Sequence, residues 1–296
     1  MRNSFGRWIH EEVRKNPNIY LLSGDIGFGI FDDLIEEHPK HFINCGIAEQ
    51  NMIGTAAGLS QLGLVPFVYT IIPFLIYRPF ELIRNLIAHQ NQKVILVGVG
   101  GGFSYDNLGF THYAKEDLVL ISTLPNMKIF TPYDPISAEK CFDSALQSEG
   151  PSYVRLMKGG EPNQNPLSCS DGFDVLEKYG DDFSIFTHGS ICSNGLTALK
   201  MLKEIGLCGT LCCIWNASNT IKAVSSAQGP IFFLEEQIFP GILGLKYLEA
   251  NISSKRHHFL GIKRHLDNPL MTREKLLAHH KLSPEEIFSF IQKELN

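Results

Sequence analysis

The chain of 296 residues lacks the features of a secreted, membrane or nucleic-acid-binding protein. Its first residues contain no apolar core of about 7 to 15 residues, and no later run reaches the roughly 18 apolar residues of a membrane helix. The formal net charge is −5 and basic residues are scattered, apart from the short patch Lys255-Arg256-His257-His258. We therefore expect a cytoplasmic protein without a nucleic acid or membrane partner.

Cysteine is present, but not in a pattern that builds disulfides or a metal site. The seven cysteines are odd in number and irregularly spaced, and none forms a paired spacing with histidine. The adjacent Cys212 and Cys213 lie in an apolar run, which favours reduced thiols inside a buried strand. No metal site is expected in this chain.

Short apolar runs alternate with amphipathic stretches, and this alternation is typical of a parallel α/β sheet. With 44% hydrophobic residues, the chain is long enough for two such domains. Strands are predicted at residues 19–22, 65–69, 94–99, 128–130 and 153–156, then at 183–187, 210–215, 231–234 and 259–262. Helices are predicted near 4–16, 47–62, 79–90 and 134–148, and a closing helix begins with Ser283 as N-cap and Pro284 at its first position.

A segment rich in Gly, Pro and Asn separates the two series of strands. Residues 159–166 have no periodicity and collect residues that break helices and strands. We place the domains at 1–160 and 173–296, with a linker at 161–172.

Glu49 opens a helical stretch on its apolar side. Glu49, Met52, Ile53, Ala56 and Ala57 share one helix face, and no Lys or Arg lies three or four residues from Glu49. Burying an unpaired charge costs several kcal/mol, so this carboxylate requires a cation, a proton or a ligand. A half-solvated residue of the first helical turn is the ordinary alternative.

Four motifs follow predicted strands and would meet at the edge of the sheet where open α/β folds bind ligands. They are Gly24-Asp25-Ile26-Gly27, Gly46-Ile47-Ala48-Glu49-Gln50-Asn51-Met52, Phe74-Leu75-Ile76-Tyr77-Arg78, and Gly109-Phe110-Thr111-His112 with Glu116-Asp117. This ordered set resembles the pyrimidine-binding and C-terminal domains of transketolases and deoxyxylulose phosphate synthases, and the likeness covers nearly the whole chain.

The resemblance implies that thiamine diphosphate binds with its pyrimidine ring against this chain. Glu49 would hydrogen-bond N1′ of the aminopyrimidine and so promote its imino tautomer. Phe74, or a neighbouring tyrosine, is similar to the aromatic residue that stacks on this ring. Asp25 and Ile26 match a loop that touches the thiamine. Arg78 is a further candidate cofactor contact, although it could instead begin its helix and pair with Glu81.

Other positions resemble residues that bind the sugar. His112 is similar to the histidine that binds sugar hydroxyls or transfers a proton, while Arg155 and Lys158 resemble the basic positions used for a sugar phosphate. Solvated charge is an equal alternative for these two. Transketolases carry another histidine and an acidic residue before the Thr-His pair, where this chain has residues 100–103 and 106–108. The sugar is therefore left open.

The diphosphate-binding motif is absent. Thiamine enzymes hold Mg²⁺ and diphosphate with Gly-Asp-Gly followed by Asn, whereas Gly24-Asp25 here continues into Ile26 and Gly180-Asp181 into Asp182. The resemblance therefore implies the C-terminal subunit of a split transketolase. A separate subunit would bring the Gly-Asp-Gly motif and Mg²⁺, and the two would form an α2β2 complex. In the second domain, Glu235-Glu236-Gln237 resembles a Glu-Glu-His run of the family.

The expected activity is transfer of a two-carbon ketol unit from a ketose to an aldose. A deoxyxylulose phosphate synthase-like enzyme and the β subunit of a 2-oxoacid dehydrogenase E1 component are alternatives within the same fold. A non-catalytic scaffold partner is the alternative from another class.

Overall fold

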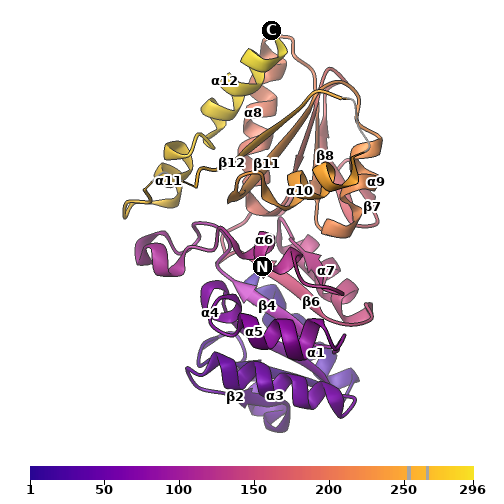
Figure 1. Cartoon of the computed structure of the whole chain (residues 1–296), viewed down its shortest axis with the longest axis vertical. Coiled ribbons are helices and arrows are strands. Elements are labelled where there is room, and N and C mark those ends of the chain that lie inside the picture. Colours follow the sequence, from indigo (N-terminus) through magenta and orange to yellow (C-terminus); the bar gives the residue numbers. More distant parts are fainter. Residues whose placement is uncertain (252–254, 265–266) are drawn as a thin grey trace. The chain divides into compact units, whose positions relative to one another are not determined.

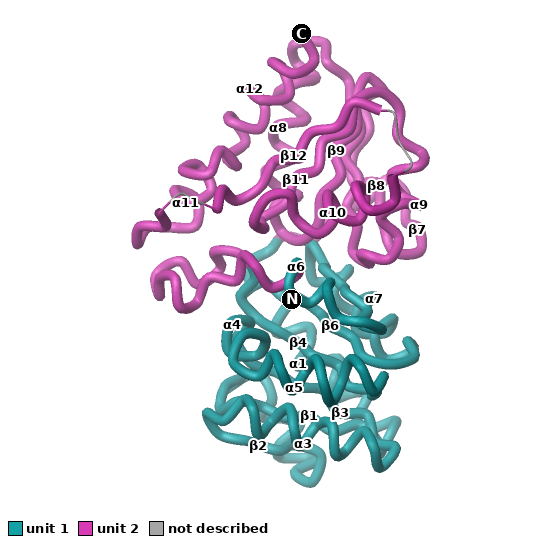
Figure 2. Tube along the Cα trace, in the orientation of Figure 1, with its two compact units in different colours: residues 1–101, 119–161 teal, residues 102–118, 162–296 magenta. Residues whose placement is uncertain are grey.

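The computed structural model describes residues 1–251, 255–264 and 267–296. The chain forms two compact units, each described separately below (Figure 2). Unit 1 contains residues 1–101 and 119–161, and unit 2 contains residues 102–118 and 162–296. Each unit has one six-stranded sheet with helices, which confirms the predicted pair of α/β domains.

The sheet of unit 1 is entirely parallel, in the order β2-β1-β3-β4-β6-β5. Its strands are β1 (Ile19–Ser23), β2 (Phe42–Asn44), β3 (Val65–Ile71), β4 (Ile95–Val99), β5 (Lys128–Phe130) and β6 (Ser152–Leu156). Five of the six were predicted. The short edge strand β2 was missed because its three residues bury no complete apolar side chain.

Helices follow most strands of unit 1 (Figure 1). They are α1 (Arg2–Lys15), α2 (Asp32–Glu37), α3 (Glu49–Gln61), α4 (Ile72–Ile76), α5 (Phe80–Leu82) continued by a π-helical turn (Ile83–Ala88), α6 (Asp117–Ser122) and α7 (Pro135–Gln147). Phe5 of α1 lies at the centre of the core, with its ring 5.1 Å from that of Phe142 and 5.6 Å from that of Tyr69. These contacts fix α1 and α7 against the sheet.

The sheet of unit 2 is mixed, in the order β12-β11-β9-β10-β8-β7. Its strands are β7 (Ser168–Ser170), β8 (Phe173–Lys178), β9 (Ser184–Thr187), β10 (Thr210–Ile214), β11 (Ile231–Ile238) and β12 (His257–Ile262). Strands β9 to β12 pair with one another in parallel, and β8 runs antiparallel to β10 and β7. Strands β7 and β8 were not predicted, and β7 lies within the stretch expected to be linker.

Within unit 2, α8 (Cys192–Glu204) and α12 (Pro284–Leu295) lie on one side of the sheet, and α9 (Thr220–Ser225) and α10 (Gly241–Ala250) lie on the other (Figure 1). Helix α11 (Arg273–His279) precedes α12. The Ser283 hydroxyl accepts a hydrogen bond from the Glu286 amide, as its predicted capping role requires. Cys212 and Cys213 are buried free thiols in β10, and burial raises the pKa of both.

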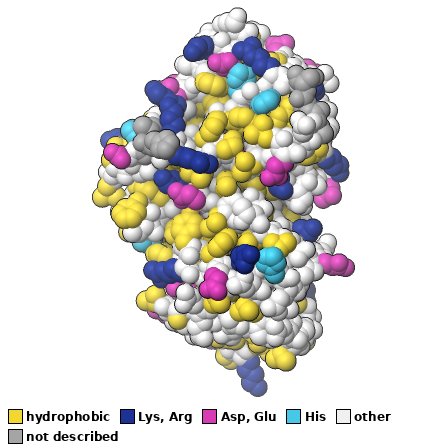
Figure 3. Space-filling view, viewed as in Figure 1, with side chains coloured by type: hydrophobic (Ala, Val, Ile, Leu, Met, Phe, Trp, Pro, Cys, Tyr) yellow, Lys and Arg dark blue, Asp and Glu magenta, His cyan; other side chains and the backbone are white. Residues whose placement is uncertain are grey.

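Among the described residues, no helix combines the length and the hydrophobicity needed to cross a bilayer. On the face drawn in Figure 3, basic and acidic side chains are interspersed.

Candidate cofactor and substrate site

Three neighbouring strands of unit 1 bring the predicted cofactor residues to one edge of the sheet. Strands β2, β1 and β3 are adjacent and parallel, so their carboxyl ends lie together. Asp25 follows β1, Glu49 opens the helix after β2, and Arg78 follows β3. The topology therefore brings three of the four predicted motifs to one sheet edge of the kind where open α/β folds bind ligands, and the fourth, which contains His112, belongs to unit 2.

Glu49 is the first residue of α3 and is 4% exposed. The buried residues of this helix are the five that the helical spacing predicted, Glu49, Met52, Ile53, Ala56 and Ala57. The half-solvated alternative for this carboxylate is therefore wrong. Its place in the first turn still favours the negative charge, because the helix dipole is positive there.

Arg78 is the partner of this carboxylate. Its Nη1 atom donates to both Glu49 oxygens at 2.9 Å, and its guanidinium carbon lies 4.1 Å from the centre of the Phe74 ring. The alternative pairing of Arg78 with Glu81 is wrong, because Arg78 reaches back across 29 positions of sequence instead. The planar guanidinium of Arg78 thus hydrogen-bonds the buried Glu49 carboxylate while its face lies over the Phe74 ring.

The loop after β1 is held by hydrogen bonds to neighbouring residues. Asp25 has a left-handed backbone, with φ of 58°, and accepts a hydrogen bond from the Asn44 amide at 2.9 Å. The Ser23 hydroxyl donates to the Ile26 carbonyl at 2.7 Å. A Cβ atom on Gly24 would lie 3.0 Å from the Thr70 hydroxyl, so this position requires glycine's small size to bring β1 and β3 together at their ends.

The two basic candidates from β6 differ in exposure. Arg155 is 3% exposed, and its guanidinium lies beneath Gly101, where an added Cβ would approach Nη1 to 2.7 Å. Lys158 is exposed, two residues after the strand ends. The solvated-charge alternative is therefore wrong for Arg155, and the role of the exposed Lys158 stays a prediction.

His112 belongs to unit 2, although it follows a strand of unit 1 in the sequence. Figure 2 draws the stretch that contains it, residues 102–118, in the colour of unit 2. Residues 102–118, here called the His112 segment, form part of unit 2. The half-buried His112 ends a single helical turn (Phe110–His112), and its Nδ1 lies 3.0 Å from the Thr111 hydroxyl. The structure thus groups Glu49, Arg78 and Phe74 in unit 1 and places His112 in the other unit.

Glu236 and Gln237 of β11 anchor the His112 segment. The buried Glu236 carboxylate accepts from the Phe103 amide at 2.9 Å and from Nε of Arg273 at 3.1 Å. The Arg273 backbone amide donates to Asp106 at 2.8 Å. The side-chain amide of Gln237 donates to Asp117 at 2.9 Å. The Glu-Glu-Gln run therefore holds the strand-following loop that carries His112.

His280 packs against the same segment as a neutral ring. It stacks on Phe103 with centroids 5.4 Å apart, its Nε2 lies 2.8 Å from Asn268 Oδ1, and its Nδ1 accepts from the Lys263 amide at 3.2 Å. Burial lowers the pKa of His280 to about 4, with the nearby His279, Lys115 and Lys263 as further causes. Because Nδ1 already accepts a hydrogen bond, a second proton would break that contact.

Sequence reasoning missed these anchoring residues because each acts across a large separation in the chain. Glu235, adjacent to them, is also buried and accepts the amides of Leu243 and Gly244 at 3.0 Å each, at the start of α10. A run of two glutamates inside an apolar strand was the available signal, since a strand buried on both faces holds charge only where partners exist.

Comparisons with known proteins agree with this architecture. The family model for the transketolase pyrimidine binding domain matches residues 1–162. The chain is 29% identical to one of the subunits of the apulose-4-phosphate transketolase from Phocaeicola vulgatus, over 84% of this chain and 82% of that protein. It is 27% identical to an uncharacterized 33.6 kDa protein in the fasciation locus of Rhodococcoides fascians, over 90% of this chain and 86% of that protein.

Among solved structures, a split gene transketolase in the form of an inactive beta4 tetramer aligns with a TM-score of 0.84 at 28% identity. The alignment covers 99% of this chain and 97% of that one. The chain therefore belongs to the transketolase family. The prediction that it corresponds to the C-terminal subunit of a split transketolase is confirmed by these relatives.

Proposed function

We propose that this chain is the pyrimidine-side subunit of a thiamine diphosphate-dependent enzyme that transfers a two-carbon ketol unit from a ketose to an aldose. The observation that carries the proposal is the buried Glu49 carboxylate at the carboxyl edge of the sheet, hydrogen-bonded to a planar nitrogen group that lies over Phe74.

The residues present fit an aminopyrimidine ring. Such a ring is planar, carries a nitrogen that hydrogen-bonds a carboxyl group, and stacks on an aromatic face, which are the properties the guanidinium of Arg78 displays here. The buried Thr70 hydroxyl, which has no hydrogen-bond partner among the described residues, adds an unused polar group beside Gly24. Asp25 and Ile26 would border the thiamine from the loop after β1.

Thiamine diphosphate, when bound, would supply the nucleophilic carbon that attacks a ketose carbonyl and holds the two-carbon unit during transfer. Glu49 would share a proton with N1′ of the pyrimidine, and Phe74 would orient the ring. Arg78 would hold the carboxylate in place before the cofactor binds.

Each unit carries a candidate sugar contact: His112 in unit 2, and Lys158, for an anionic group, in unit 1. Arg155 would act from beneath the Gly101 backbone. His112 would hydrogen-bond a sugar hydroxyl or take its proton, as a half-buried imidazole can. The altered residues before His112 leave the sugar's identity to product analysis.

A partner subunit with Gly-Asp-Gly and a later Asn would bring Mg²⁺ and bind the diphosphate. We propose an α2β2 complex in the cytoplasm that acts in carbohydrate metabolism. The relative from Phocaeicola vulgatus supports this division, because its own name makes it one subunit of a transketolase.

Reconstitution with such a partner tests the proposal. The complex is expected to convert a ketose and an aldose only when thiamine diphosphate and Mg²⁺ are added. Glu49→Gln should lower turnover by about 100-fold or more, because a positioned acid or base contributes at least that much. The matched control is Glu81→Gln, since Glu81 is an exposed glutamate of the same domain.

Three outcomes contradict the proposal. Full turnover with Glu49→Gln would remove Glu49 from the mechanism. Pyruvate decarboxylation without ketol transfer would indicate a 2-oxoacid dehydrogenase component. An assembled complex that binds no thiamine diphosphate would indicate a scaffold subunit.

A further inference from the structure

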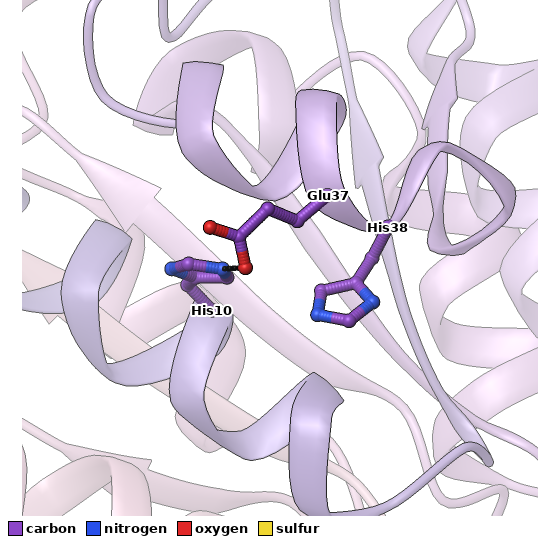
Figure 4. Close-up of side chains that lie close together, drawn as sticks. All are labelled: His10, Glu37 and His38. Atoms are coloured by element: carbon purple, nitrogen blue, oxygen red, sulfur yellow. Dashed lines mark hydrogen bonds and ion pairs between the residues drawn. The ribbon is translucent and has the colours of Figure 1, made fainter.

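Three metal-binding side chains from two helices of unit 1 converge at a place that thiamine chemistry does not use. His10 lies on α1, Glu37 is the last residue of α2, and His38 follows it (Figure 4). One ligand atom from each lies within 4.8 Å of the others. His10 Nε2 is already 3.1 Å from a Glu37 oxygen.

The His38 ring has an unused nitrogen at this point. Its Nε2 atom is buried and has no hydrogen-bond partner among the residues the structure describes. A buried polar atom left unpaired is unfavourable, and a neutral imidazole nitrogen is a strong metal ligand. The ring centroids of His10 and His38 are 5.8 Å apart and tilted by 56°, so their edges can face a common centre.

The spacing is close to that of a tetrahedral site. With bonds of about 2.0–2.1 Å, two ligand atoms of a tetrahedral Zn²⁺ lie roughly 3.3 Å apart. The observed 3.1 Å between His10 and Glu37 is near this value, and the His38 ligand atom lies within 4.8 Å of both.

Solvent and ions can reach the cluster. Glu37 has 56% of its side chain exposed, and His10 also lines a polar cleft of about 380 Å³. Besides His10, the ionisable side chains that line this cleft are the two acids Glu11 and Asp33 and the base Arg7, so the excess of carboxylates favours a cation over an anion.

We propose that His10, Glu37 and His38 form a site for a borderline transition metal of the Zn²⁺ class, with a coordination position open to solvent. Two imidazoles and one carboxylate suit Zn²⁺, whereas Mg²⁺ requires mainly oxygen ligands. The site ties α1 to the end of α2. This inference is independent of the ketol-transfer proposal and of any Mg²⁺ held by a partner.

Titration of the chelator-treated, reduced full-length chain with ZnCl2 by isothermal calorimetry tests the site. The wild type is expected to show one site that His38→Ala weakens by about 100-fold or more, since loss of a direct ligand exceeds the loss of a supporting residue. His38→Ala leaves the His10–Glu37 hydrogen bond in place but removes ring contacts with His10 and His41, so each protein is compared with its own metal-free melting temperature. Added Zn²⁺ should raise that temperature in the wild type and not in the variant.

Two further variants separate the cluster from other ligands. Glu37→Gln, at an exposed position, should also weaken binding, and His89→Ala, an exposed histidine of the same unit, should not. Because the described cysteines are free thiols, the Co²⁺ complex is examined by absorption, where a nitrogen and oxygen ligand set gives no thiolate charge-transfer band. Equal Zn²⁺ binding by wild type and His38→Ala, a thiolate band, or displacement of Zn²⁺ by equimolar Mg²⁺ would each overturn the proposal.

Discussion

Replacing Glu236 by Gln should release the His112 segment from unit 2. The carboxylate is buried and accepts from the Phe103 amide and from the Arg273 guanidinium. The isosteric amide can keep one acceptor, but its NH2 group then faces another donor. Breaking a fully buried ion pair costs about 3–5 kcal/mol of stability. Because the Arg273 side chain is 29% exposed and water can reach it, we expect Glu236→Gln to destabilise the packing of the His112 segment by about 2–4 kcal/mol.

Hydrogen–deuterium exchange of the full chain measures how much Glu236→Gln destabilises the His112 segment. A loss of 2–4 kcal/mol corresponds to about 30- to 1000-fold faster exchange in peptides from residues 102–118, with little change in unit 1. The matched control is Glu294→Gln, whose partner Arg256 is 56% exposed, and it should change stability by about 1 kcal/mol or less. Unchanged exchange in the His112 segment, or an equal acceleration in both units, would refute the reasoning.

Two further predictions concern His280 and Arg78. The pKa of His280 is about 4 in the folded chain and about 6.5 in the unfolded chain. Its neutral ring therefore contributes fully to the free energy of unfolding above pH 6.5, and this contribution, at most about 3 kcal/mol, is lost as pH falls toward 4. Urea unfolding of His280→Gln should depend less on pH than that of the wild type, whereas His279→Gln, at an exposed neighbouring position, should behave like the wild type. Arg78→Ala should destabilise unit 1 by about 1–3 kcal/mol, less than for a fully buried pair because the Arg78 side chain is 47% exposed, and Arg84→Ala, an exposed control, should leave urea unfolding unchanged.

Most of the fold could be predicted because its strands are buried on both faces and therefore read as continuous apolar runs. Nine of the strands were expected from this signal, as in Val94-Ile95-Leu96-Val97, which contains most of β4. The missed strands β2, β7 and β8 lie at or beside sheet edges. There, one side of the strand meets solvent, so the side chains need not be apolar.

The cofactor edge could be predicted in outline, but its contacts could not. The helical spacing placed Glu49 on a buried face, and the strand order placed Asp25, Glu49 and Arg78 at one edge. No local pattern pairs Glu49 with a residue 29 positions away, because such a contact depends on how β3 and α3 pack. The same reason hid the partners of Glu236 and the convergence of His10 with Glu37.

The proposed function gives the Glu49–Arg78 pair a physical role in a cofactor site that is divided between two subunits. A subunit that meets its cofactor only after assembly must fold first, and a buried carboxylate without a partner would then cost several kcal/mol. A fully buried cation would remove that cost, but it would also stay bound to the carboxylate after assembly and so block the hydrogen bond to the cofactor. Arg78 is half exposed and stacked on Phe74, so it neutralises Glu49 and can leave at little cost when a heterocycle offers the same hydrogen bond. Arg78→Ala should therefore destabilise the free subunit more than the assembled, thiamine-loaded complex, and equal destabilisation of both would contradict this role.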